Sequence, residues 1–250
     1  MLALPQWHTT DLSSLRSITS GSSIVPPSLI ETVRQRGLPV QKVYGLTETS
    51  PIAVYQSTEQ AKTKFHSTGL AALHCQMTLV DKDNIKVPDG QVGRILIKGP
   101  NVLFEYWGNP QATAEALNNG WFDTGDVALI DPEGYLQITD RTKDVIKSGG
   151  EWISSIDIEN AASNHEGVAE AAVIGCYHPR WTERPLLVVV KQPGASLDKD
   201  AMMEFLKDKL EKVSMPNDVQ FVDELPHTAT GKVSKLDLRK VFSDYAFPEA

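Results

Sequence analysis

Residues 140 to 154 read Asp140-Arg-Thr-Lys-Asp-Val-Ile-Lys-Ser-Gly-Gly-Glu-Trp-Ile-Ser154, and the character of the chain changes here. This stretch carries three cations, two adjacent glycines and a tryptophan. The residues before it read as short strands and turns, whereas those after it predict a helix from about Ser155 to Asn164. Because a charged connection of this kind suits a hinge beside an anionic ligand, we expect a boundary between domains at residues 1–140 and 141–250.

The composition is that of an ordinary globular protein, with 250 residues, 41% hydrophobic and 22% charged. A formal net charge of −8 argues against a nucleic-acid-binding surface, which usually shows a basic excess. The longest aliphatic run, Leu186 to Val190, is far too short for a membrane span. Cys75 and Cys176 lie far apart without metal-ligand spacing, which favours reduced thiols in a cytoplasmic protein.

The part before the boundary mixes helix and strand and then becomes β. Ser28 and Glu31 have capping-box spacing, which predicts a helix that starts at Ser28 and ends near Gly37. Short strands separated by turns favour a small distorted barrel. The strands are predicted at Val40–Val43, Met77–Val80, Val92–Lys98, Val127–Ile130 and Tyr135–Ile138, with a helix near Pro110–Leu117.

The part after the boundary predicts a small α+β domain, so the fold class of the whole chain is α/β. Strands are expected at Ala171–Gly175, Leu186–Lys191 and Val219–Val222. A helix from Asp198 to Lys212 is expected between the last two of them, because its apolar residues recur on one face.

Four motifs together resemble those of the acyl-adenylate-forming (AMP-binding) superfamily, which holds acyl-CoA synthetases, peptide-synthetase adenylation domains and beetle luciferases. They are Tyr44-Gly-Leu-Thr-Glu-Thr-Ser-Pro51, Trp121-Phe-Asp-Thr-Gly-Asp126, the stretch at 140–154 and Pro226-His-Thr-Ala-Thr-Gly-Lys232, in the family's order. The resemblance covers essentially the whole chain, but it matches only the second half of such an enzyme. It implies ATP, Mg²⁺ and coenzyme A as cofactors.

The first motif supplies candidate groups for the nucleotide. Thr47 and Glu48 follow a predicted strand and Gly45, where a hydroxyl can bind an α-phosphate and a carboxylate can support Mg²⁺. The resemblance gives these residues those roles and places Tyr44 against adenine. Taken by itself, a Thr-Glu pair is more often a strand-end turn with a solvated glutamate. Gly21 corresponds loosely to a glycine that lines the acyl and adenine pockets.

The second and third motifs supply candidate ribose ligands. The carboxylate of Asp126 accepts hydrogen bonds, which matches the two hydroxyl donors of a ribose. The resemblance gives this role to Asp126, adds Arg141 as a second ribose contact and makes Lys143 the hinge between half-reactions. An arginine that lies over the barrel surface is the plain alternative for Arg141.

The glycine pair in the third motif could admit a thin ligand. Gly149 and Gly150 lack Cβ atoms, so a chain such as pantetheine could pass close to the backbone, although a tight hairpin turn needs the same residues. By resemblance, Lys147 faces the active site in the second half-reaction, while a solvated strand lysine is about equally expected. For Trp152, a packing role is weighed slightly above a ligand role.

The last motif contains Lys232 in a Thr-Gly-Lys loop. An exposed loop lysine is usually inert, but the resemblance makes this one the catalytic lysine of adenylation. Its ammonium would lie between the substrate carboxylate and the α-phosphate, where it offsets charge that develops in the transition state.

The Ser/Thr/Gly-rich phosphate loop of the family has no counterpart in these residues, nor does a G-x-x-x-x-G-K-[ST] loop. We therefore expect an incomplete form of an acyl-CoA synthetase, with the missing amino-terminal half as a possible partner. Trp152 and the stretch Tyr177-His-Pro-Arg-Trp-Thr-Glu-Arg-Pro-Leu-Leu-Val188 resemble fatty-acyl-CoA and methylmercaptopropionate-CoA ligases, so a fatty acid is the expected carboxylic acid substrate. The alternatives are a non-catalytic remnant, half of a split enzyme, or an adenylation domain that loads a carrier protein.

Overall fold

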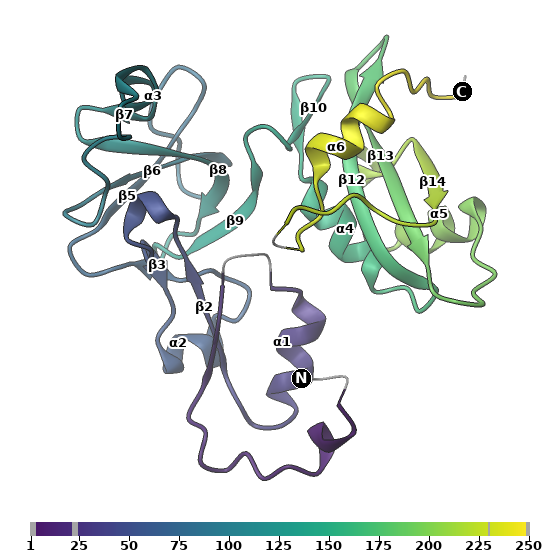
Figure 1. Ribbon diagram of the computed structural model, residues 1–250, viewed down its shortest axis with the longest axis horizontal. Helices are drawn as coiled ribbons and strands as arrows, with labels where there is room; N and C mark the ends of the chain where they lie inside the picture. The colour runs from purple at the N-terminus through teal and green to yellow at the C-terminus, as the bar shows by residue number, and fades with distance from the viewer. Residues whose placement is uncertain (1–3, 22–24, 230, 249–250) are drawn as a thin grey trace. The chain divides into compact units, whose positions relative to one another are not determined.

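The computed structural model describes residues 4–21, 25–229 and 231–248, and the chain folds into two compact units (Figure 1). Unit 1 comprises the residues up to Thr124 together with Ala128–Ile138. Unit 2 comprises Gly125–Val127 and the residues from Thr139 onward. The domain assignment at residues 140 and 141 stays a prediction.

Unit 1 begins with a small four-stranded sheet. Strands β1 (Ile18–Ser20) and β2 (Val40–Tyr44) are parallel, whereas β3 (Val54–Tyr55) and β4 (Leu70–Ala71) continue the sheet antiparallel. Helix α1 (Pro27–Arg34) connects β1 to β2 and buries Ile30 and Val33 in a core that includes Trp7 and Val40. The shorter elements are η1 (Pro5–His8), η2 (Thr47–Thr49) and α2 (Thr58–Thr63).

The predicted start of the first helix is wrong. Helix α1 spans Pro27–Arg34 and is preceded by Pro26, with no side-chain hydrogen bond that caps it. Ser28 lies inside the helix, where its carbonyl accepts from the Thr32 hydroxyl at 2.9 Å. Proline at the first helical position already has the φ that a helix needs and lacks an N–H that would otherwise want a partner, so the helix begins before Ser28.

A curled five-stranded sheet, most of whose residues belong to unit 1, confirms the small distorted barrel (Figure 1). Its strand order is β5-β6-β8-β7, and β9 pairs with β8. Its core contains Leu79, Ile95, Ile97, Ala128 and Leu136. The elements are β5 (Gln76–Val80), β6 (Gly93–Lys98), α3 (Pro110–Ala116), β7 (Leu117–Asn118), β8 (Trp121–Ile130) and β9 (Leu136–Arg141).

Unit 2 is built on a five-stranded sheet whose longest members, β12 (Val168–His178) and β13 (Thr182–Lys191), form an antiparallel pair (Figure 1). Alternate residues of these strands serve two cores. Val173 and Leu187 pack against helices α4 (Ser155–Ser163) and α5 (Lys199–Lys207). Ile174 and Leu186 pack with Leu238 of α6 (Lys235–Val241). The remaining elements are β10 (Ile146–Ser148), β11 (Glu151–Ile153), α4 (Ser155–Ser163), α5 (Lys199–Lys207), η3 (Lys212–Ser214), β14 (Asp218–Val222) and α6 (Lys235–Val241).

Helix α5 is shorter than predicted, since it ends at Lys207 instead of Lys212. Leu206 is fully buried, and Leu210 packs against the same core although it lies just after the helix. A turn follows in which Lys209 and Leu210 both donate to the Leu206 carbonyl. Within the described ranges, no helix is long and apolar enough to cross a bilayer.

Candidate functional site

The first group of candidate residues lies where β1 and β2 end. Because these strands are parallel, with Ser20 paired to Lys42, Gly21 and Tyr44 come out at the same edge of the sheet. A Cβ on Gly21 would lie 2.5 Å from the Val43 side chain, so only glycine lets the chain pass there. The carboxyl edge of parallel strands is where α/β proteins bind ligands.

The turn that follows β2 is packed closely. A Cβ on Gly45 would lie 1.6 Å from the Pro51 carbonyl oxygen, which excludes every other residue. The fully buried Thr49 accepts from the Leu46 amide at 2.9 Å through its hydroxyl. The turn therefore has a fixed backbone, and it presents Thr47 as an exposed side chain.

Glu48 is held from outside the turn. Its carboxylate accepts a hydrogen bond of 3.0 Å from the Tyr106 hydroxyl, and its carbonyl accepts one of 2.8 Å from the Leu103 amide. Burial, and then the hydrogen bond to Glu48, raise the pKa of Tyr106, so the hydroxyl stays protonated and donates. These contacts come from a loop far along the chain.

The residues around Glu48 suit a magnesium ion that is bound by one carboxylate and by the nucleotide, and not one that is enclosed by protein ligands alone. Among the described residues, no three acidic, histidine or cysteine side chains are placed to hold a metal together. Mg²⁺ commonly keeps several waters and binds through one or two carboxylates plus substrate phosphates. Glu48 with a nucleotide phosphate satisfies that chemistry.

Asp126 and Arg141, the two candidate ribose ligands, lie in contact. Arg141 Nε is 3.3 Å from Asp126 Oδ1, with the Asp126 side chain 10% exposed and that of Arg141 55% exposed. The backbone segments that carry these two residues are also joined, because the Thr142 amide donates to the Gly125 carbonyl at 2.9 Å. The carboxylate oxygens of Asp126 are hydrogen-bond acceptors, which suits the hydroxyl groups of a ribose.

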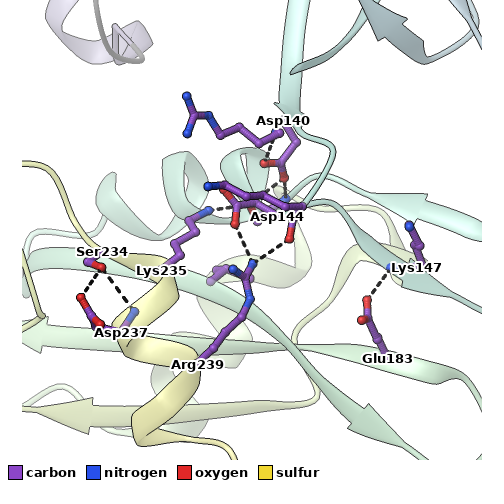
Figure 2. Close-up of polar contacts among 12 residues, drawn as sticks. Asp140, Asp144, Lys147, Glu183, Ser234, Lys235, Asp237 and Arg239 are labelled. Carbon is purple, nitrogen blue, oxygen red and sulfur yellow. Dashed lines mark hydrogen bonds and ion pairs between the residues drawn. The ribbon is translucent and has the colours of Figure 1, made fainter. Parts of the chain in front are cut away.

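The linker, which begins at Asp140 near the end of β9, is anchored by polar contacts within unit 2 (Figure 2). Asp140 is almost fully buried, and its carboxylate accepts from both the amide and the hydroxyl of Ser155, at 2.7 and 2.6 Å. Lys235 of α6 donates to the same hydroxyl at 2.6 Å and pairs with Glu159 at 2.7 Å. Arg239, one turn along α6, contacts the hinge candidate Lys143 and its neighbour Asp144.

The hairpin β10–β11 carries the candidate groups for the thiol cofactor. Lys147 and Trp152 are paired directly across the hairpin, so their side chains share one face. The Lys147 amide donates to Glu183 at 2.9 Å, as Figure 2 shows. Trp152 is 37% exposed, which leaves part of the indole open to a ligand.

The glycine pair closes this hairpin with left-handed backbone, since φ is 59° at Gly149 and 95° at Gly150. Gly149 also donates its amide to the Trp181 carbonyl at 2.9 Å. A Cβ on Gly149 would lie 2.8 Å from the Trp181 indole, so the close approach of that ring requires glycine as much as the turn does.

Lys232 lies in a tight loop just before α6. The Thr228 amide donates to the Lys232 carbonyl at 2.7 Å, and a β-bridge joins His227 to Val233. Gly231 has a φ of 78°, which favours glycine. Lys232 is exposed. The loop thus fixes the backbone of the lysine and leaves its long side chain at the surface.

Two sequence models of the AMP-binding enzymes match the chain. The model described as AMP-binding enzyme matches residues 1–107, and the model described as AMP-binding enzyme C-terminal domain matches residues 157–232. The chain belongs to the AMP-binding enzyme family. The match to the C-terminal domain model ends at the candidate catalytic residue Lys232.

Relatives of this AMP-binding chain are CoA ligases. It is 45% identical to the indoleacetate–CoA ligase of Aromatoleum aromaticum, covering 100% of this chain and 49% of the relative. It is 41% identical to a long-chain-fatty-acid–CoA ligase of Thermus thermophilus, covering 94% of this chain and 46% of the relative. The chain thus spans about half the length of the curated relatives it matches.

A similar solved structure is the o-succinylbenzoate CoA synthetase of Bacillus subtilis in complex with its acyl-adenylate intermediate. It has a TM-score of 0.84 and 32% identity, over 94% of this chain and 47% of that one. The same synthetase solved with ATP and a magnesium ion gives a TM-score of 0.82 and 32% identity, over 90% and 46%.

Several residues of this AMP-binding chain that hold the candidate site residues in place were not predicted from the sequence. They are Leu103 and Tyr106 beside Glu48, Trp181 beside Gly149, and Ser155, Lys235 and Arg239 beside the linker. Only the spacing of α6 carried a signal: Lys235 and Arg239 are four apart and so share a helix face. Nothing local in the sequence pairs the others with their partners.

Proposed function

We propose that the chain carries nucleotide-binding and thioester-forming residues of an AMP-forming acid–thiol ligase. The observation that carries the proposal is the contact of Asp126 with Arg141 at 3.3 Å, because two residues expected to bind one ribose lie together. The family membership and the CoA ligases among its relatives support the same reaction class.

The first half-reaction joins the acid to AMP. A carboxylate oxygen of the acid attacks the α-phosphorus of ATP, and the bond to pyrophosphate breaks to leave acyl-AMP. In this proposal, Asp126 and Arg141 hold the ribose, Tyr44 lies against adenine and Thr47 binds the α-phosphate. Bound Mg²⁺, supported by Glu48, would offset phosphate charge, and the Lys232 ammonium would stabilise the transition state.

The second half-reaction forms the thioester. The thiol of coenzyme A attacks the acyl carbon, and AMP leaves with the bonding electron pair. The turn at Gly149 and Gly150 offers side-chain-free backbone for the pantetheine arm, with Lys147 on the adjoining strand. Lys143 would be the hinge that exchanges one arrangement for the other.

The acid is proposed to be a fatty acid, with aryl acids as the competing class. Relatives named for long-chain fatty acids and for indoleacetate are similarly close to this chain, at 41% and 45% identity. The enzyme is placed in the cytoplasm, in keeping with its two free cysteines, of which Cys176 is buried. A segment that binds the pyrophosphate part of ATP has to complete the site, because residues 1–250 contain no phosphate-loop motif.

A fusion tests this proposal. The amino-terminal half of the Aromatoleum aromaticum relative, joined to residues 1–250, makes a protein that we name the fused ligase. Acid-dependent ATP–pyrophosphate exchange and acyl-CoA formation are measured with acids from acetate to palmitate and with indoleacetate and ferulate. We expect both activities in the fused ligase and neither in residues 1–250 alone.

The controls separate loss of folding from loss of function. The circular dichroism and thermal unfolding of the fused ligase show whether it is folded. A folded protein that forms neither acyl-AMP nor acyl-CoA with any of these acids would contradict the proposal and favour a non-catalytic remnant. Acyl-AMP without acyl-CoA, with transfer to a carrier protein instead, would favour the carrier-loading alternative.

A further inference from the structure

A loop that is distant in sequence, from Asn101 to Tyr106, forms hydrogen bonds to the turn that carries Glu48. Asn101 donates through its side-chain amide to the Thr49 carbonyl at 2.8 Å, and Leu103 donates through its backbone to the Glu48 carbonyl at 2.8 Å. The third contact differs from these two, because Tyr106 donates to the Glu48 side chain at 3.0 Å. The loop therefore fixes both the backbone and the carboxylate of Glu48.

Tyr106 is itself held in place by helix α3. Its amide donates to the Thr113 hydroxyl at 3.0 Å, and its carbonyl accepts from the Asn109 amide at 3.0 Å. Asn109 in turn caps α3 through the Ala112 amide at 3.0 Å. A tyrosine ring has few rotatable bonds, so a fixed backbone leaves the hydroxyl little freedom.

The other aromatic residues of this loop behave differently. Phe104 is 89% exposed and Trp107 is 95% exposed, whereas Tyr106 between them is half-buried. The loop therefore leaves two more apolar aromatic side chains, those of Phe104 and Trp107, in solvent, whereas the Tyr106 hydroxyl contacts Glu48. Burial of apolar surface does not explain why Tyr106 is the aromatic residue that turns inward, but its hydrogen bond to the Glu48 carboxylate does.

We propose that Tyr106 is a positioning residue that orients the Glu48 carboxylate toward the Mg²⁺ that accompanies ATP, an inference that rests on the proposed function. The tyrosine hydroxyl occupies one oxygen and limits rotation of the group, which leaves the other oxygen for the metal. Hydrogen bonds that orient a ligating carboxylate commonly change metal affinity by roughly 10- to 100-fold.

The first test needs no nucleotide and uses residues 1–250. The order parameter of the Glu48 side chain, from ¹³C relaxation, is measured in the wild type, in Tyr106→Phe and in Tyr135→Phe. Phenylalanine keeps the ring and removes only the hydroxyl, and Tyr135 is a matched tyrosine in the barrel. We expect the order parameter to fall in Tyr106→Phe alone. An unchanged value would overturn the proposal.

The second test measures metal binding in the fused ligase without turnover. Mn²⁺ is titrated by electron paramagnetic resonance in the presence of α,β-methylene-ATP, whose carbon bridge prevents loss of pyrophosphate. We expect Tyr106→Phe to weaken Mn²⁺ binding about tenfold. In separate turnover assays with ATP, the KM for the acid should stay unchanged. In a Glu48→Gln background, Tyr106→Phe should have no further effect.

The outcomes distinguish the two proposals. If Glu48→Gln leaves Mn²⁺ binding unchanged, the metal role of Glu48 fails and the positioning role fails with it. If Glu48→Gln weakens binding but Tyr106→Phe does not, only the positioning role is overturned. Equal weakening by Tyr106→Phe with and without Glu48 would also overturn it, since the hydroxyl would then act through another group.

Discussion

Arg239 Nη2 lies 2.7 Å from Asp144 Oδ1 and 3.1 Å from the Lys143 carbonyl oxygen, so helix α6 holds the linker at its predicted hinge. Asp140, at the start of the linker, is bound to Ser155. Both ends of the linker are thus tied to unit 2. A hinge motion at Lys143 has to preserve or break these contacts, and Arg239 therefore influences how readily it occurs.

Replacing Arg239 by glutamine should destabilise the chain. The change removes the charge opposite Asp144, whose side chain is 11% exposed, and hydrogen bonds to charged groups contribute about 1.5 to 3 kcal/mol. Urea unfolding followed by circular dichroism measures the loss. Lys240→Ala is the control, because its pair with Asp237 is exposed and solvent-exposed pairs contribute little to stability. Equal losses in the two variants would show that the Arg239 contacts contribute nothing special.

The hinge itself is tested by Lys143→Pro in the fused ligase. Proline fixes φ near about −65° and removes a backbone donor, so it should trap one conformer. We expect that conformer to be the adenylating one, with acyl-AMP still formed and thioester formation reduced steeply. Lys143→Ala should have a mild effect, since the charge is not the proposed cause. Acyl-CoA formation near the wild-type rate in the proline variant would move the hinge elsewhere, with Asp144 the next candidate.

Lys42 predicts a pH dependence of stability. Burial lowers the pKa of this lysine to about 8, while its ammonium donates to the His66 carbonyl at 3.1 Å. The pKa of Lys42 is lower in the folded state than in the unfolded state. At pH values between these two pKa values, the unfolded state therefore binds more protons than the folded state. The free energy of unfolding should therefore rise as the pH increases from about 8 toward about 10.5.

Lys42→Met removes the titrating group and keeps an apolar side chain of similar length. The difference in unfolding free energy between wild type and Lys42→Met, from urea titrations at about pH 7 and about pH 10, should shift in favour of the wild type at the higher pH. A difference that does not change with pH would show that Lys42 titrates in the folded chain as it does in water.

Local features of the sequence predicted much of the fold. The hairpin β10–β11 follows from Gly149 and Gly150, because a tight turn with positive φ favours glycine. The capping-box spacing of Ser28 and Glu31 gave the first helix correctly but not its first residue, because the helix already begins at Pro27. Helix α5 was predicted to reach Lys212 because the apolar spacing continues to Leu210, which packs on the core although it lies after the helix.

In the candidate site too, the sequence predicted residues that are close together in the chain but not their partners from distant segments. Thr47 and Glu48, or Gly149 and Gly150, are neighbours in sequence, so a motif predicts them together. The residues that support them come from distant segments, as Tyr106 does for Glu48 and Arg239 does for Asp144. Such pairings depend on how whole elements pack, and hydrophobic periodicity reports only which face of each element is buried.

The most direct test of the ligase account is Lys232→Ala in the fused ligase, with the two half-reactions measured separately. The lysine is expected to act on the α-phosphate and to leave before the thiol attacks. Removing a preorganised charge of this kind costs on the order of 10²- to 10³-fold. The account predicts that ATP–pyrophosphate exchange falls by that factor while coenzyme A transfer from supplied acyl-AMP is largely kept. Equal loss in both half-reactions, or no loss in exchange, would contradict it.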